Sequence, residues 1–534
     1  MKIKRTKCFL KKISIRIGLG IVILILGFMH AYSQCYFADR YGAGGNDSYG
    51  CDITLDPRSN SYSVGKIWNN STSTYNLKLQ KRDETGNIIW TTTENANLGD
   101  AFDPEVYQMN IAYYNGNVYV TGLINGTINL SSNLFNSING NIIVAKYDAG
   151  TGNFVTGYQP LVNVSGGISG LRMCMDNSGN FFLAGSFVEN LTIGSITYTS
   201  IGWPTYPAED LFIIKLDPTG NILWQRKAGG SGNDYVLSIA YENYFSVDQL
   251  CIGGSYQGNF TYPPGYQISG SFGINGVDGY VIKINPATGM QLSPFTSINV
   301  VPIGSVGGHG VDVKAVKIKN GILYFAGNAY DSHIYVQSAG LQMNNTFDNK
   351  FYAATIPFDF SASVSAHEMG YNGDFFPLDI AFNSTNLFIT GYYSGSNATF
   401  GGSPSSAAVN LPSYGNNDIF VARCNLASFY LDAAYHYGGI GNNESYAIES
   451  DDCHFYYTGS FNGTSNFNPV VLNSSSSSYT DQFVSANGVY GGGNLTISSS
   501  TSNNLLCYGG TVTLTSQPSG LSYLWGTGGN KALV

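Results

Sequence analysis

Charged residues are scarce in this sequence: Asp, Glu, Lys and Arg together make up only 11% of its 534 residues. Histidine and cysteine are scarce as well, at six and eight residues, and no CxxC or HExxH pair occurs. The histidines are scattered along the chain, and their spacing argues against a zinc site. The sequence also lacks a GxSxG nucleophile motif and a Walker loop, which argues against an α/β-hydrolase and a P-loop nucleotidase.

The abundant residue types indicate β-structure. Hydrophobic residues make up 43% of the chain, which also contains 66 glycines and 39 tyrosines. β-Branched and aromatic side chains suit the pleated surface of a sheet, while Gly and Asn suit tight turns. Because this hydrophobic content is enough to bury a core, we expect many short strands rather than disorder.

Residues 1–34 have the pattern of a secretory signal peptide. Seven Lys and Arg residues come before an apolar run of 13 residues at 17–29, and small residues follow it. A membrane-spanning helix would need roughly 20 apolar residues. Cleavage after Ser33 or Gln34 would give a secreted or outer-surface protein without a stable membrane span. An uncleaved anchor and a lipid attached to Cys35 are the alternatives.

Removal of that segment would leave an acidic protein. It takes away seven basic and no acidic residues, so 18 basic residues remain against 34 acidic ones, a formal net charge of −16. An acidic surface repels phosphate backbones, so we expect no nucleic-acid partner. The seven remaining cysteines are too sparse for a disulfide framework, although Cys35 and Cys51 are candidates for one disulfide.

One sequence element recurs seven times: an apolar strand that ends in glycine, as in "FFLAGSF" and "LCIGGSY". A glycine inside a strand suggests that another segment of backbone approaches it closely. Successive copies stand 57 to 73 residues apart, and the repeated glycines are Gly65, Gly122, Gly185, Gly254, Gly327, Gly391 and Gly459.

Each copy belongs to a unit of four predicted strands, here named A to D. Strand A precedes the glycine-containing strand B, a variable loop follows, and a turn such as "DPTGN" at 217–221 joins strands C and D. Pro218 fixes φ for a turn, and Gly220 can adopt the positive φ that closes a hairpin. Four antiparallel strands repeated in this way predict an all-β fold, a β-propeller whose extra length lies mainly between B and C.

The two ends of the repeat region are complementary. The chain after residue 35 opens with a D strand, and "DQFVSANG" at 481–488 is a C strand without a D strand of its own. We therefore expect strand 36–42 to pair beside 481–485 and to complete the last blade. Such closure removes exposed sheet edges and gives seven blades over 35–488.

The unit "KLDPTGNILW…AGGSGNDY…GGSY" resembles the bacterial SBBP-type β-propeller repeat, which occurs in exported surface proteins. The resemblance is clearest at 210–256 and good at 417–461, whereas the fifth unit, "KFYAATIPFDF", lacks the Asp–Gly turn. The resemblance implies that the protein is a scaffold, and it assigns no catalytic residues to this sequence.

Residues 489–534 have a different pattern. The string "C-x-G-x-x-V-T-L-T … Y-L-W" resembles the start of the Ig-like modules of large Bacteroidetes surface proteins, with Cys507 and Trp525 at the matching places. A sandwich of this type needs about 100 residues. We therefore expect 489–534 to be an incomplete Ig-like segment.

Polar turns before strand A offer one candidate for metal binding. Asn46–Asp47, Asn233–Asp234 and Asn442–Glu444 recur at one blade position. Their oxygens could bind calcium, or their side chains could cap the backbone of the turn. Capping is favoured, because carboxylates on separate blades cannot reach one ion. We expect no cofactor, with calcium as the alternative.

The sequence shows none of the active-site patterns of catalytic propellers that we compared with it. The "PTGNILW" turn resembles that of quinoprotein propellers, with Trp90 and Trp224 at the matching places. We identify no pocket for pyrroloquinoline quinone, no sialidase Asp-box and no arginine cluster.

Two loops between strands B and C, at 201–210 and 260–267, combine proline with tyrosine. Aromatic rings supply contact area at low entropic cost, so these loops are candidates for ligand binding. The residues concerned are Trp203, Tyr206, Tyr262 and Tyr266.

These patterns favour a non-catalytic scaffold for binding or adhesion, with a glycan or a protein as its ligand. One alternative is a structural spacer within a larger surface protein. The other is a propeller-type glycan lyase or hydrolase, which would need carboxylates that converge at one mouth of the channel. Sequence spacing does not reveal such convergence.

Overall fold

The computed structural model describes residues 35–42, 45–94, 109–201, 208–263, 265–269, 276–292, 296–300, 310–330, 333–336, 339–342, 348–358, 364–396, 398–401, 408–476 and 478–488. The chain divides into the units Met1–Ala31 and Tyr32–Val534, and all described residues lie in the second. They form 39 β-strands and contain no helix that is long and apolar enough to cross a membrane. The predicted signal peptide and Ig-like segment lie outside them.

Seven antiparallel four-stranded units, blades I to VII, form the core of the fold, and in four of them a hairpin extends the sheet to six strands. Each blade has its strands in the order A, B, C, D. Blade I consists of β2 (Tyr49–Leu55), β3 (Ser61–Asn69), β4 (Thr74–Arg82) and β5 (Ile88–Glu94), and blade II of β6 (Met109–Tyr114), β7 (Asn117–Leu130), β8 (Asn133–Asp148) and β9 (Phe154–Tyr158). Blade III consists of β11 (Ile168–Met175), β12 (Phe181–Phe187), β15 (Asp210–Leu216) and β16 (Ile222–Gly230).

The remaining blades repeat this order. Blade IV consists of β17 (Tyr235–Tyr244), β18 (Val247–Gln257), β21 (Val277–Ile284) and β22 (Thr296–Val300), and blade V of β23 (Ala315–Lys319), β24 (Ile322–Ala329), β27 (Lys350–Pro357) and β28 (Ser365–Tyr371). Blade VI consists of β29 (Asp374–Phe382), β30 (Asn386–Ser394), β33 (Asp418–Asn425) and β34 (Leu431–Gly439), and blade VII of β35 (Asn443–Ser450), β36 (His454–Phe461), β39 (Asp481–Gly488) and β1 (Cys35–Tyr41).

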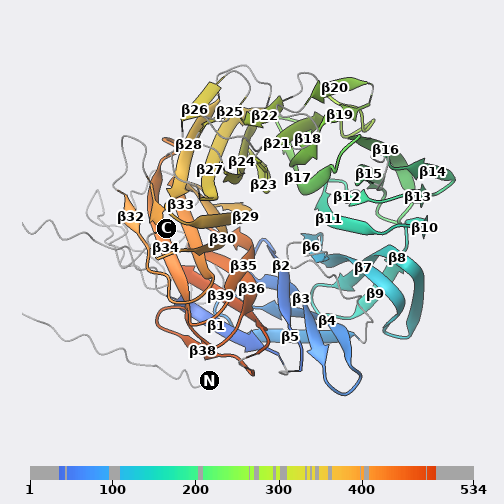
Figure 1. The fold of residues 1–534 in the computed structure, drawn as a ribbon. Helices are drawn as coiled ribbons and strands as arrows, with labels where there is room; N and C mark the ends of the chain where they lie inside the picture. The colour runs from blue at the N-terminus through green and yellow to red at the C-terminus, as the bar shows by residue number, and fades with distance from the viewer. Residues whose placement is uncertain are drawn as a thin grey trace, which may run out of the picture. The chain divides into compact units, whose positions relative to one another are not determined.

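The A strands lie around a common centre (Figure 1). Neighbouring A strands contact each other in the order β2, β6, β11, β17, β23, β29 and β35, and β35 contacts β2 in turn. The ring is therefore closed, and the prediction of a seven-bladed β-propeller is confirmed.

Strand β1 closes the ring as the sequence predicts. It pairs antiparallel with β39, from Phe37 opposite Ala486 to Tyr41 opposite Gln482. The guanidinium of Arg40 lies 2.8 Å from the Asp481 carboxylate and adds an ion pair to the strand pairing. The first and last strands of the repeat region thus belong to one sheet.

The extra residues between strands B and C form hairpins. In blades IV to VII, each hairpin pairs with strand D of the preceding blade: β19 (Asn259–Tyr262) and β20 (Tyr266–Ser269), β25 (His333–Val336) and β26 (Ala339–Gln342), β31 (Thr399–Phe400) and β32 (Val409–Asn410), and β37 (Thr464–Asn466) and β38 (Val471–Asn473). In blade III the hairpin of β13 (Asn190–Ile193) and β14 (Ile196–Thr199) pairs with β10 (Leu161–Val164), just after β9. These hairpins cover strand edges that would otherwise be open to another chain.

The repeated glycines lie where the inner two strands approach most closely. In three blades, a Cβ atom on this glycine would overlap a carbonyl oxygen of strand A; these glycines are Gly254, Gly391 and Gly459. In blade V, a Cβ atom on Gly327 would overlap the carbonyl oxygen of Asp312, in the segment that leads into β23. In blades IV, VI and VII a β-bulge lies opposite the glycine, as where Val236 faces Gly254 and Ser238 faces Gly253. The predicted close backbone approach is confirmed for these blades.

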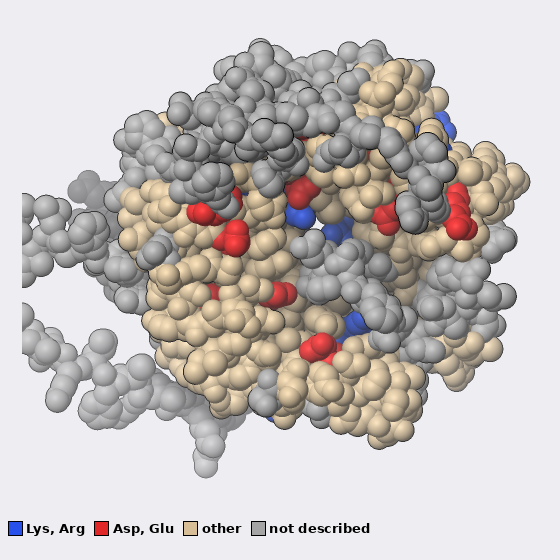
Figure 2. All heavy atoms as spheres, in the orientation of Figure 1, with Lys and Arg blue, Asp and Glu red and all other residues tan. Residues whose placement is uncertain are grey.

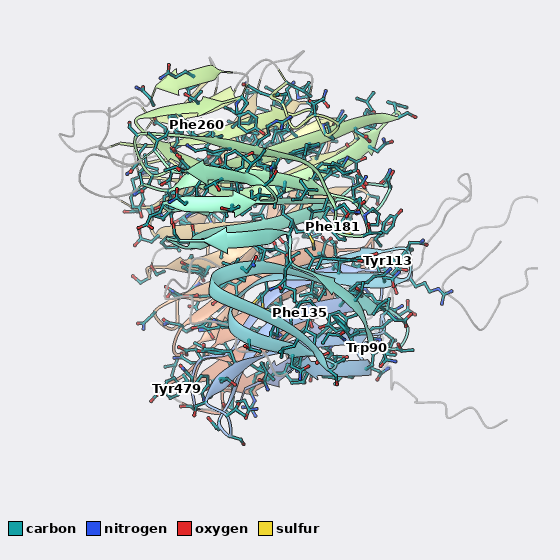
Figure 3. The ribbon with its side chains drawn as sticks, turned by 90° about the vertical axis from the view of Figure 1, so that its right-hand side faces the viewer. Trp90, Tyr113, Phe135, Phe181, Phe260 and Tyr479 are labelled. Carbon is teal, nitrogen blue, oxygen red and sulfur yellow. The ribbon has the colours of Figure 1, made fainter. Side chains whose placement is uncertain are left out.

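Aromatic residues of strand D join each of four blades to the next. Each ring packs on the C–D turn glycine of the following blade, and that glycine has a positive φ. The pairs are Phe37 with Gly86, Trp90 with Gly152, Tyr158 with Gly220, and Trp224 with Gly289. Figure 3 shows Trp90 at the side of the stacked blades. The two tryptophans also donate hydrogen bonds to carbonyls of the same turns.

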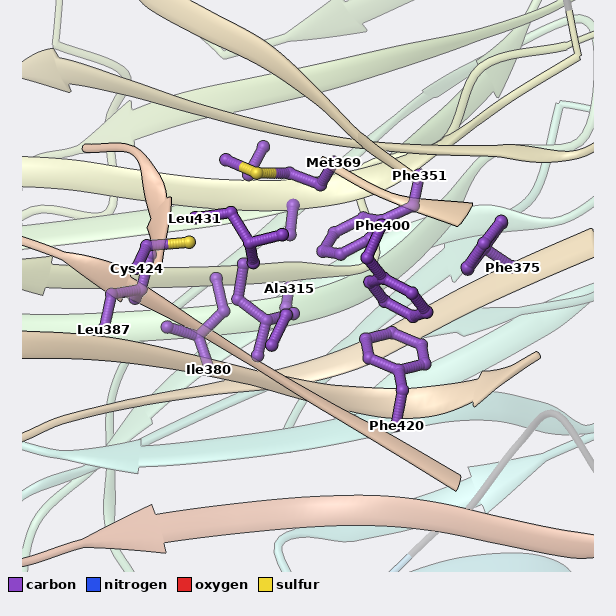
Figure 4. Close-up of a cluster of buried hydrophobic side chains, with 14 of the residues drawn as sticks. Ala315, Phe351, Met369, Phe375, Ile380, Leu387, Phe400, Phe420, Cys424 and Leu431 are labelled. Atoms are coloured by element: carbon purple, nitrogen blue, oxygen red, sulfur yellow. The ribbon is translucent and has the colours of Figure 1, made fainter. Parts of the chain in front are cut away.

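The hydrophobic core lies between blades rather than in one central cluster. Figure 4 shows one part of it, where Phe351 of β27 meets Phe420 of β33 and Phe400 of β31. All three rings are completely buried, and burial of each contributes about 1.5–3 kcal/mol. Large side chains in these layers fix the spacing of the blades and hence the width of the channel.

Candidate ligand site in the central channel

The loop residues proposed from the sequence do not assemble into a site. Trp203 and Tyr206 lie outside the described residues, as does the side chain of Tyr266 in β20. Tyr262 is completely buried, and its hydroxyl donates a hydrogen bond of 3.1 Å to the carbonyl of Gly289. Because β19–β20 extends the sheet of blade III, this ring is part of the core and is not available to a ligand.

The structure instead contains a cavity of about 440 Å³ at the centre of the ring. All seven A strands contribute to its wall, together with the segments that lead into β23 and out of β24. Figure 2 shows an opening near the middle of this face, with Lys, Arg, Asp and Glu side chains close to it. This convergence of residues across the ring was not accessible from sequence spacing.

One A-strand position recurs in every blade, and in five of the seven blades its residue is polar and lines the channel. In each of the seven blades, one A-strand residue pairs with the residue before the repeated glycine. Around the ring these residues are Asp52, Asn110, Arg172, Ser238, Ala315, Asp379 and Ala447. An alignment of the seven units on their glycines would have found this position in the sequence.

The five polar members of this set hold neighbouring A strands together. Asp52 accepts a hydrogen bond of 2.8 Å from the backbone N–H of Ile111, and Asp379 accepts one of 2.9 Å from that of Ile448. In the other three cases Asn110 donates to the carbonyl of Leu171, Arg172 donates to that of Leu237, and Ser238 accepts from the N–H of Val316. Much of the polar wall is therefore structural.

Two ion pairs add further charges to the channel wall. Lys317 lies 3.6 Å from the Glu449 carboxylate, which joins blades V and VII across the channel, and Lys314 lies 3.4 Å from Asp312. The side chains of Lys317 and Glu449 are both about one-third exposed to the channel. These groups are enclosed by the blades but remain in contact with channel solvent.

The enclosure shifts the ionisation of this cluster. Burial, together with the negative charge of Asp379, raises the pKa of Asp52 to about 7, although backbone N–H groups favour its ionised form. Burial alone would lower the pKa of Lys317, but Glu449, Asp379 and Asp52 together raise it. Burial also raises the pKa of Glu449. The carboxylates therefore take up protons more readily than ordinary surface acids do.

Aromatic side chains line one end of the cavity. Phe376 and Tyr392 stand opposite each other in β29 and β30, and their rings stack with centroids 4.7 Å apart and an interplanar angle of 20°. Tyr235 and Tyr330 line the same cavity, and Tyr330 is 42% exposed. The cavity thus combines a polar, charge-paired wall with an aromatic end.

The polar turns before strand A are used in backbone contacts. Asp234 accepts hydrogen bonds from the N–H groups of Gly230 and Gln257, and Asp47 accepts from the backbone and hydroxyl of Thr480. Among the described residues, no group of three or more His, Cys, Asp and Glu side chains is placed to hold a metal ion. Calcium binding stays a prediction without support from these turns.

The proposed disulfide between Cys35 and Cys51 is wrong. Cys51 is a free, buried thiol in the channel wall, and Cys453 is disulfide-bonded instead. Cys51 lies in β2 of blade I, whereas Cys35 lies in β1, which belongs to blade VII. The two residues are close in sequence but belong to different blades.

The chain is similar in fold to solved β-propeller structures, at low sequence identity. No family model matches the chain, and no curated protein matches it. Among solved structures, it is similar to the quinohemoprotein alcohol dehydrogenase from Comamonas testosteroni, with 10% identity, coverage of 89% of this chain and 78% of that chain, and a TM-score of 0.37. It is also similar to BamB from Moraxella catarrhalis, with 10% identity, 85% and 99% coverage, and a TM-score of 0.34.

A protein of unknown function from Dyadobacter fermentans DSM 18053 is similar as well, with 9% identity, coverage of 72% of this chain and 96% of that chain, and a TM-score of 0.37. None of these similarities bears on a ligand or a reaction.

Proposed function

We propose that this protein is an exported, non-catalytic binding scaffold whose ligand, a glycan or a protein segment, enters the central cavity. The observation that carries this proposal is the cavity of about 440 Å³ to which all seven blades contribute. Ligand pockets combine a concave, partly apolar surface with a few converging polar groups, and this cavity has both. The predicted signal peptide and acidic balance support a location at the cell surface or outside the cell.

The hydrogen bonds of the channel carboxylates support a non-catalytic role. A carboxylate with a raised pKa in a cavity is a candidate general acid, and Asp52 meets that description. One of its oxygens, however, accepts from the N–H of Ile53 and the other from that of Ile111. Asp379 is bound in the same way by Ile380 and Ile448. Both side chains are therefore engaged in holding blades together.

The proposal is tested by binding of recombinant 35–488 to a glycan and polysaccharide array, with and without calcium. We expect saturable binding that is lost in Phe376→Ala and Tyr392→Ala, because both rings line the cavity. Phe245→Ala is the matched control, since Phe245 is 84% exposed in the A–B turn of blade IV and does not line the cavity.

Binding that survives both cavity substitutions would place the ligand elsewhere and overturn the proposal. If the protein binds no glycan, and if Phe376→Ala does not weaken binding to any protein ligand, the structural spacer would be favoured. Conversion of a bound glycan into products would favour the glycan lyase or hydrolase, and Asp52→Asn would then abolish turnover.

A further inference from the structure

We infer that the ligand of the central cavity is an uncharged sugar, whose ring packs on the Phe376–Tyr392 pair while its hydroxyls meet the charge-paired wall. This inference rests on the proposed function and narrows it to one ligand class. It is carried by three features of the cavity: its aromatic end, the pairing of its cations with carboxylates and its size.

The aromatic pair is preformed: its two rings stack on each other, so the pair offers a sugar the outer face of one ring. Phe376 and Tyr392 come from adjacent strands, A and B, of blade VI, and register places them directly opposite each other. Both side chains are partly exposed in the cavity. A pyranose ring presents an apolar face of C–H groups, which gains dispersion and electrostatic contact with an aromatic face at little entropic cost, because both surfaces are rigid.

Each cation of the described wall has a carboxylate as its neighbour, and the carboxylates outnumber the cations by four to three. Lys317 is paired with Glu449, and Lys314 with Asp312. Burial lowers the pKa of Arg172, and the negative charges of Asp52 and Asp379 oppose this shift, so the guanidinium also has carboxylates close to it. Among the described residues that line the cavity, every cation therefore has a carboxylate to neutralise it, and none is left over for an acidic ligand.

This pairing discriminates between classes of sugar. A uronic acid or sulfated sugar would bring a further negative charge beside Asp312, Asp379 and Glu449 and would have to lose its hydration. Hydroxyl groups can donate to the carboxylates and accept from the ammonium and guanidinium groups without adding charge. The wall thus favours uncharged polyols over anions.

The size of the cavity agrees with a short sugar segment. About 440 Å³ lies within the range of roughly 300–1,000 Å³ that is typical of small-molecule pockets. A terminal one- or two-residue segment of an oligosaccharide fits this space better than an internal stretch of a thick polymer.

The test compares an oligosaccharide with its uncharged derivative. Calorimetric titration of 35–488 with tetragalacturonate and with its methyl ester separates charge from ring shape, and cellotetraose, xylotetraose and mannotetraose extend the uncharged set. We expect binding to uncharged oligosaccharides that is at least about tenfold tighter than to the acid, equal to about 1.4 kcal/mol. Phe376→Ala should abolish it, whereas Phe245→Ala should leave it intact.

A second variant reports on the charge pairing itself. Asp312→Asn removes the negative charge that lies 3.4 Å from the Lys314 ammonium. We therefore expect this variant to gain affinity for tetragalacturonate at least several-fold, with little change for the methyl ester. An unchanged preference in this variant would contradict the argument from charge.

The outcomes separate this inference from the proposed function. Acidic oligosaccharides that bind more tightly than uncharged ones, with binding lost in Phe376→Ala, would overturn the inference and leave the cavity as the binding site. Binding that is indifferent to Phe376→Ala and Tyr392→Ala would overturn both. Thermal unfolding of every variant, compared with the parent protein, identifies any loss that is due to misfolding.

Discussion

At the scale of single residues, the repeated glycine of strand B determines how strand A runs past it. The missing side chain leaves room for a carbonyl oxygen of the bulged A strand, and the bulge in turn directs the next A-strand side chain toward the neighbouring blade. The glycine and the cross-blade hydrogen bond are thus two consequences of one local geometry.

Substitution of Gly254 tests this geometry. In Gly254→Ala the new methyl group would overlap the Tyr235 carbonyl, so we expect a loss of about 1–3 kcal/mol in the free energy of unfolding. Urea denaturation monitored by tryptophan fluorescence measures it. Gly150→Ala, in an exposed turn where the nearest atom would be 3.3 Å away, is the control and should change stability by less than about 0.5 kcal/mol. Equal effects of the two substitutions would refute the close approach.

The raised pKa of Asp52 makes stability depend on pH. Its value of about 7 in the folded protein lies above the value of about 3.9 in an unfolded chain. Between these values the folded state binds a proton that the unfolded state has lost, so the free energy of unfolding falls as the pH rises from about 4 to 7. Because asparagine does not titrate, Asp52→Asn should flatten this part of the profile.

Urea midpoints of the parent and of Asp52→Asn across this pH range provide the measurement. Asp217→Asn is the control, because hydrogen bonds from Asn221 and Thr219 lower the pKa of Asp217 and its effect on stability appears only in acid. Parallel profiles for the parent and Asp52→Asn above pH 4 would show that Asp52 ionises normally.

At the scale of elements, β1 differs from every other strand because it belongs to the blade at the opposite end of the chain. Without it, the buried strand β39 would become an unpaired edge. Unpaired edges associate with other chains. The closure therefore protects the protein from aggregation as well as completing the ring.

Deletion of β1 tests that role. We expect 45–488 to self-associate or to unfold at lower temperature than 35–488, which retains every strand of the ring. Size-exclusion chromatography with light scattering and thermal unfolding measure both effects. A synthetic peptide of residues 35–44 should restore the monomer and the transition. A monomeric 45–488 with an unchanged midpoint would show that the ring does not depend on this strand.

The elements also show how far sequence reasoning extends. The blade count, the role of β1 and the extra length between strands B and C were predictable, because each leaves a repeated string in the chain. The hairpins that this extra length forms were not, since β19 pairs with strand β16 of another blade. Tyr262 is unavailable to a ligand for this reason: part of a Pro- and Tyr-rich loop forms a hairpin strand whose inward face buries this ring.

The cavity was beyond sequence reasoning for a different reason. Asp52 and Arg172 are 120 positions apart, and Lys317 and Glu449 are 132 apart, yet all four lie around one channel. Only closure of the ring brings them together, and closure depends on the radius that the packing between blades sets. Alignment of the seven units would find the repeated position of Asp52 and Arg172, but it would not give the width of the channel or the groups that meet across it.

At the scale of the whole molecule, the ring combines two roles in one set of residues. The A strands line the cavity, and their side chains also bond each blade to the next around five of the seven junctions. A ligand in the cavity would therefore touch several blades at once. Its binding should stabilise the closed ring as a unit, by about 2.7 kcal/mol at a hundredfold excess over the dissociation constant.

Hydrogen–deuterium exchange of 35–488, with and without a saturating uncharged oligosaccharide, tests the central claim most directly. We predict slower exchange in A-strand segments that line the cavity from separate blades, such as 235–239 and 376–379, and no change in the exposed turn at Phe245. Protection confined to the outer D strands or to the turns, with the A strands unchanged, would contradict a ligand site in the central channel.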